Sequence, residues 1–64
     1  MKLIFHQIRK NTIEKTIQFT TLGNEPTPVL DDQIFIDKDY IGDVVKIEKH
    51  YKNNKLDQIK IFVS

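Results

Sequence analysis

The sequence contains no cysteine. This absence excludes disulfide bonds, thiolate metal sites and a cysteine nucleophile, which small secreted domains and many small metalloproteins depend on. The absence of cysteine is most consistent with a reducing compartment, so we expect a cytoplasmic protein. The apolar run at residues 3–5 is too short for a signal-peptide core or a membrane span, and no membrane association is expected.

Other catalytic groups are also scarce. Serine occurs once, as Ser64, and the five threonines lie mostly at spacings typical of an outer strand face. The two histidines, His6 and His50, fall on different predicted strands and lack further ligands for a zinc ion. No acid, base and nucleophile set occurs at a recognisable spacing, so we do not expect an enzyme.

One segment has part of the pattern of a calcium-binding loop. Asp37, Asp39, Gly42 and Glu48 stand at loop positions one, three, six and twelve. Position five, which must supply an oxygen ligand, is Ile41. Acidic residues are common in tight hairpin turns, so we interpret the segment as a turn and predict no metal and no cofactor.

A chain of 64 residues accommodates a single domain, 1–64, because so short a chain buries only about 60% of its unfolded surface. Such a marginal core makes self-association favourable, and a homodimer is expected. Ten basic and nine acidic residues give a net charge of +1, so no strong overall field is predicted. Ten isoleucines, nine lysines and no alanine favour β-structure and suggest an AT-rich bacterial or phage gene.

The periodicity predicts five strands, at 2–9, 12–21, 33–37, 44–51 and 58–63. The segment 22–32 contains Gly23, Pro26 and Pro28 and reads as an irregular crossing loop. We therefore predict an all-β fold, a five-stranded antiparallel meander that closes into a partial barrel. Its expected core consists of the apolar residues that alternate along these strands: Ile13, Ile17, Phe19, Ile34, Ile36, Val45, Ile47, Ile59 and Ile61.

The last two strands form a predicted hairpin whose register follows from parity, since opposed residues must point to the same face. A two-residue turn at Asn53 and Asn54 would place Ile47 opposite Lys60. A three-residue loop at 52–54, or a bulge of equal effect, would instead place Ile47 opposite Ile59, and we expect this second arrangement.

The alternative for 39–52 is a helix, because Tyr40, Val44, Ile47 and Tyr51 also recur at helical spacing, which would give a ββαβ fold. Gly42 and the β-branched residues favour the strand.

The order of these segments resembles a known group of domains. The stretch "KTIQFTTL", a proline-containing loop, "QIFIDKDY", "DVVKIEKHY" and "DQIKIFV" is similar to small SH3-like β-barrels of bacteria and phages. The likeness covers about three quarters of the chain and rests on strand order and turn positions. It implies a fold and transfers no site residue, and the sequence has Asp-Lys-Asp where such turns usually have Asp-Gly.

Two surfaces are candidates for function. A basic edge of the last hairpin would suit phosphates, or would simply protect the strand edge, and comprises Lys46, Lys49, His50, Tyr51, Lys52, Lys55 and Lys60. Phe35 and Phe62 are out of phase with the neighbouring isoleucines and would form an apolar partner patch. We expect a non-catalytic protein-interaction or assembly module, in keeping with a phage or mobile-element gene, that pairs with a protein partner or with itself. The alternative is a weak nucleic-acid-binding barrel that uses the lysine-rich hairpin.

Overall fold

The structure is a computed structural model that describes residues 1–23 and 26–64. The described residues form five strands and no helix: β1 (Lys2–Arg9), β2 (Thr12–Thr20), β3 (Gln33–Ile36), β4 (Asp39–Lys52) and β5 (Lys55–Val63). The prediction of an all-β fold is confirmed, and the helical alternative for 39–52 is wrong. The β-branched residues of that segment lie in the longest strand of the sheet.

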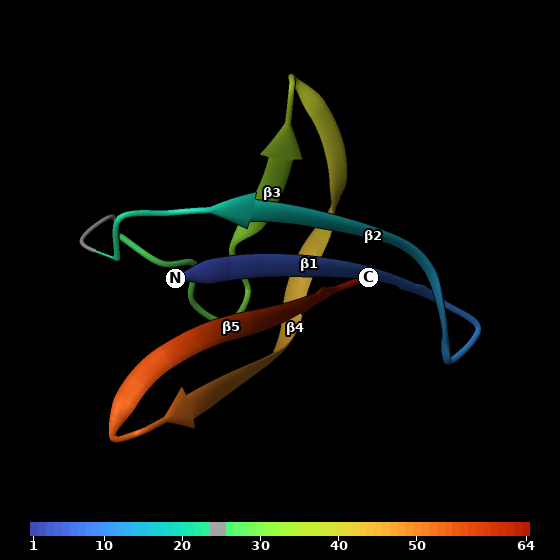
Figure 1. Cartoon of the computed structure of the whole chain (residues 1–64). Coiled ribbons are helices and arrows are strands. Elements are labelled where there is room, and N and C mark those ends of the chain that lie inside the picture. Colours follow the sequence, from blue (N-terminus) through green and yellow to red (C-terminus); the bar gives the residue numbers. More distant parts are fainter. Residues whose placement is uncertain (24–25) are drawn as a thin grey trace.

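The five strands form one sheet in the order β2-β1-β5-β4-β3, curled into a half-barrel (Figure 1). Neighbours in sequence pair antiparallel, except that β2 and β3 do not pair. The seam between β1 and β5 is parallel, which differs from a purely antiparallel meander. The reason is geometric, because the first and last strands of an alternating five-strand chain run in the same direction. The resemblance to SH3-like barrels stays a prediction.

Each of the three hairpins closes with a two-residue turn. The turn residues are Lys10 with Asn11, Asp37 with Lys38, and Asn53 with Asn54, and all six have φ between 52° and 71°. Positive φ at both central residues defines the type I′ turn, whose twist matches that of the flanking strands. These turns contain no glycine.

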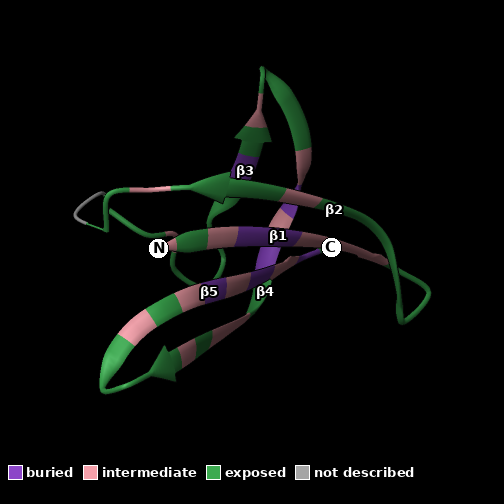
Figure 2. Cartoon of the chain, in the orientation of Figure 1, coloured by how far each residue is buried: buried purple, intermediate pink, exposed green. Residues whose placement is uncertain are grey.

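The core lies where β1, β5 and β4 cross, as the purple segments of Figure 2 show. Its principal cluster comprises Phe5, Ile34, Val44, Ile59, Ile61 and Val63. Ile34, Ile59 and Ile61 confirm the prediction, and Ile17, Ile36 and Ile47 pack against the cluster as half-buried residues. Three predicted core residues are instead exposed: Ile13 at 54%, Phe19 at 40% and Val45 at 53%.

β-Bulges explain two of these corrections. Glu14 is an extra residue between the pairs Gln7–Lys15 and Ile8–Ile13, and Val45 is an extra residue between the pairs Val44–Val63 and Lys46–Phe62. An extra residue reverses the alternation of faces beyond it. Val44 therefore enters the core in place of Val45. Ile13, beyond the bulge at Glu14, points away from the core. Phe19 is exposed for another reason, because its strand lies at the edge of the sheet.

A third bulge sets the register of the last hairpin. The turn has two residues and pairs Lys52 with Lys55, so the predicted three-residue loop is wrong. The expected bulge exists, however, because the register shifts between the pairs Tyr51–Leu56 and His50–Gln58. It restores apolar pairing, but with Ile47 opposite Ile61 and not opposite Ile59.

Candidate functional site

The sheet face opposite the core carries a regular array of mostly polar side chains, which we call the polar platform. Residues paired across neighbouring strands point to the same face, so the registers define three rows of four residues. From β2 through β1 and β5 to β4, the rows are Thr20, Lys2, Gln58, His50; Gln18, Ile4, Lys60, Glu48; and Thr16, His6, Phe62, Lys46. Ile4 is the buried apolar residue in the middle of this face.

Three side chains of the third row form a chain of contacts around Phe62. The rings of His6 and Phe62 have centroids 5.1 Å apart, and Lys46 Nζ lies 5.3 Å from the Phe62 centroid. His6 Nδ1 is within hydrogen-bond distance of Thr16 Oγ1, at 2.9 Å. Phe62 is therefore held between an imidazole and an ammonium group on neighbouring strands, a setting in which a cation is attracted to the ring face.

Glu48 is the acidic residue of the polar platform and contacts two of its basic side chains, Lys46 and His50. Its carboxylate oxygens lie 2.9 Å from Lys46 Nζ and 3.1 Å from His50 Nε2. The hydrogen bond from Lys46, and then that from His50, lowers the pKa of Glu48 below its ordinary value of 4.5. The carboxylate is ionised at neutral pH and orders both neighbours.

The structure divides the predicted basic edge. Lys46, His50 and Lys60 belong to the polar platform, whereas Lys49 pairs with Ile59 and so projects on the opposite face of the sheet. The others gather at the end of the hairpin, where Tyr51, Lys52 and Lys55 are exposed beside the turn. The platform also includes Lys2 and His6 of β1, which could not be predicted because no local pattern in the sequence shows that β1 lies beside β5.

The two phenylalanines of the predicted apolar patch lie in different surroundings. Phe62 is half-buried in the polar platform. Phe35 is exposed on β3, and its ring packs against that of Tyr40 across the β3–β4 hairpin, with centroids 5.4 Å apart. Tyr40 also donates a hydrogen bond of 2.6 Å to Asp43 Oδ1, which raises the pKa of the tyrosine hydroxyl.

A second candidate region is the edge of β2. The described part of the chain pairs β2 with β1 along one side only, so its other side is an open edge (Figure 1). Its first half contains the bulge at Glu14 and the charge of Lys15, two features that discourage edge-to-edge pairing. The second half, Thr16–Thr20, is uncharged, free of bulges and rich in β-branched and aromatic residues.

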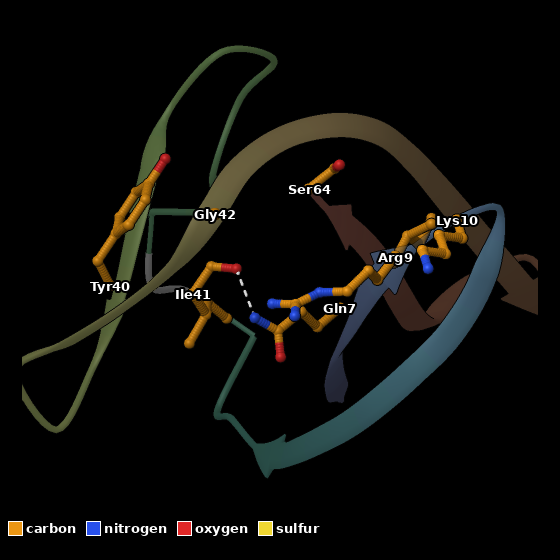
Figure 3. Close-up of a pocket in the computed structure, with 8 residues that line it drawn as sticks. Gln7, Arg9, Lys10, Tyr40, Ile41, Gly42 and Ser64 are labelled. Atoms are coloured by element: carbon orange, nitrogen blue, oxygen red, sulfur yellow. Dashed lines mark hydrogen bonds between the residues drawn. The ribbon is translucent and has the colours of Figure 1, made fainter.

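A pocket of about 460 Å³ opens between the end of β1 and the start of β4 (Figure 3). Gln7 spans it and donates a hydrogen bond of 3.0 Å to the carbonyl oxygen of Ile41. Arg9 lines the pocket, but its Nε is already 3.0 Å from Glu14 Oε2. Gly42, with φ of 138°, lies so close to Ser64 that a Cβ would stand 2.9 Å from the Ser64 nitrogen. The described residues that line the pocket include no aspartate or glutamate.

Charge is unevenly distributed although the net charge is only +1. Five of the nine acidic residues lie between positions 31 and 43, around β3 and the start of β4. β1, β5 and the end of β4 carry more basic than acidic residues, whereas β2 has one of each.

Within residues 1–23 and 26–64 no group of three or more histidine, cysteine, aspartate or glutamate residues is placed to hold a metal ion. The same residues contain no helix that is long and apolar enough to cross a membrane. Comparison of the chain with models of protein families, with curated proteins and with solved structures gave no match.

Proposed function

We propose that the protein is a non-catalytic assembly module whose β2 edge pairs with the same strand of a second copy. The observation that carries this proposal is the unprotected half of that edge, Thr16–Thr20, in a sheet whose curl stops short of closure. An open edge offers unpaired N–H and C=O groups to another strand, and backbone hydrogen bonds give such pairing most of its affinity.

The segment is suited to pair with itself. In an antiparallel arrangement about a two-fold axis at Gln18, Thr16 faces Thr20 and Ile17 faces Phe19 of the second copy. Cross-strand pairs of β-branched and aromatic residues stabilise sheets, and this register brings no like charges together. This register also covers Phe19, which is 40% exposed, because Ile17 of the second copy lies opposite it on the core face of the sheet. The second copy is therefore the occupant that the edge fits best.

The test is sedimentation velocity over a wide range of protein concentrations. We expect a dimer that dissociates on dilution and is lost in the variant Gln18→Lys, because this substitution places two ammonium groups opposite each other on the axis. The matched control is Gln33→Lys, the same substitution on the other edge strand, which should leave the dimer unchanged.

Amide hydrogen exchange supplies a second readout. Dimer formation should slow exchange within Thr16–Thr20 and leave the bulged half of β2 unaffected. A wild-type protein that is monomeric at every concentration, or a Gln18→Lys variant that dimerises normally, would refute pairing through β2.

A further inference from the structure

We infer that the polar platform is a binding site for single-stranded nucleic acid, on which lysines hold the phosphates and a base stacks beside His6 and Phe62. This site lies on a face of the sheet, not on its edge. It therefore stands independently of self-pairing through β2.

The lysines of the platform are arranged in a line. Lys2, Lys60 and Lys46 occupy successive strands, β1, β5 and β4, and each stands one row further along than the last. Neighbouring strands are about 4.8 Å apart and alternate residues about 6.7 Å apart, so each step is roughly 8 Å between Cα atoms. A diagonal row of ammonium groups gives an extended phosphate backbone one continuous path across the sheet.

The distribution of charge over the molecule also favours binding of a polyanion at the polar platform. Glu48 is the acidic residue of the polar platform, and the ammonium group of Lys46 is paired with it at 2.9 Å. The segment 31–43, which holds five of the nine acidic residues, belongs to β3 and its flanks. A polyanion is therefore attracted to one face of the molecule and repelled from another, which guides its encounter with the protein.

The aromatic pair lies beside this line and provides the second element of single-strand recognition. His6 and Phe62 are neighbours across the β1–β5 seam, and both are half-buried, so each ring still presents an accessible part. Stacking on such rings is tolerant of sequence, because every base has a π-face. The single arginine of the chain, Arg9, lies outside the platform, and arginine is the commonest reader of guanine in a duplex groove. Unpaired strands of any sequence are thus the expected ligand.

The experiment is a fluorescence anisotropy titration of labelled oligothymidylate and oligouridylate at a series of salt concentrations. We expect binding at low salt that weakens steeply as salt rises. The double variant Lys46→Gln/Lys60→Gln should lower the slope of log affinity against log salt by about 1.4, since each lost contact to a single strand contributes about 0.7. Phe62→Leu should weaken binding about five-fold or more and leave the slope unchanged.

The matched control is Lys49→Gln/Lys52→Gln. It likewise removes two positive charges from the β4–β5 hairpin, one at the opposite face of the sheet and one at the hairpin end, and should leave the slope unaltered. Circular dichroism melts establish that each variant is folded, and Phe62→Tyr, which keeps an aromatic ring, should restore binding. The inference is refuted if neither oligonucleotide binds at low salt, if the control double variant loses as much slope as the platform variant, or if a polyphosphate binds as tightly as the oligonucleotides.

Discussion

Lys38, like Lys10, is a lysine that adopts a positive φ in a hairpin turn, and of the two Lys38 has the larger value. It has φ of 71° in the turn between β3 and β4, where the preferred residue is glycine. A left-handed conformation costs an L-residue about 1–2 kcal/mol, and asparagine and aspartate tolerate it better than lysine. The turns at Asn11, Asp37 and Asn53–Asn54 use those tolerant residues.

We predict that Lys38→Gly stabilises the protein by roughly 0.5–1 kcal/mol, because the relief of strain exceeds the added entropy of glycine in the unfolded chain. Urea unfolding monitored by circular dichroism provides the measurement. Lys52→Gly is the control, since Lys52 is in a strand and its φ is not positive. That variant should be destabilised, and an equal response of both variants would contradict the role of the turn.

Glu48 makes stability depend on pH. Its pKa is lowered in the folded state by Lys46 and His50, so its contribution is complete above the unfolded value of 4.5 and is lost as pH falls through the folded pKa. The free energy of unfolding of the wild type should therefore fall more steeply below pH 4.5 than that of Glu48→Gln. Unfolding by urea at successive pH values measures the difference. In Lys46→Gln, carboxyl chemical shifts should show a Glu48 pKa closer to 4.5, and an unchanged titration would contradict the assigned cause.

For the strands, the alternation of apolar and polar residues was sufficient to locate each one, but it was not sufficient to predict which of its faces is buried. Alternation located all five strands and correctly placed Ile34, Ile59 and Ile61 in the core. It failed at Ile13 and Val45, because a single inserted residue reverses the faces without changing the composition of the strand. The basic edge was predicted from the last hairpin alone, and the structure divides its residues between the polar platform, the opposite face and the hairpin end.

The structure predicts that the core depends on β5 and not on β2. Ile61 is 0% exposed, so Ile61→Ala should cost about 2–5 kcal/mol, a large share of the stability of so small a domain. Ile13→Ala removes the same atoms from a residue that is more than half exposed and should cost less than about 1 kcal/mol. Chemical denaturation of both variants tests the assignment, and a greater loss in Ile13→Ala would favour the core predicted from alternation alone.

At the scale of the whole molecule, the half-barrel separates two kinds of surface. The edge of β2 offers backbone groups and apolar residues, and the polar platform offers cations and aromatic rings. The long-range pairing of β1 with β5 creates the platform, because it brings Lys2 and His6 beside Lys60 and Phe62. Residues so distant along the chain share no local pattern, which is why the platform could not be predicted from it.

The parallel pairing of β1 with β5 also constrains the order in which the protein folds. Of the seven buried apolar side chains among the described residues, β5 supplies three, Ile59, Ile61 and Val63, and its partner β1 lies more than 45 residues earlier in the sequence. The hairpin β1–β2 therefore cannot complete the core by itself, and Phe5 stays partly in contact with water until β5 pairs with β1. Closure of the longest loop in the protein then becomes the slow step of folding, and chains cut short before β5 should be targets for chaperones and proteases.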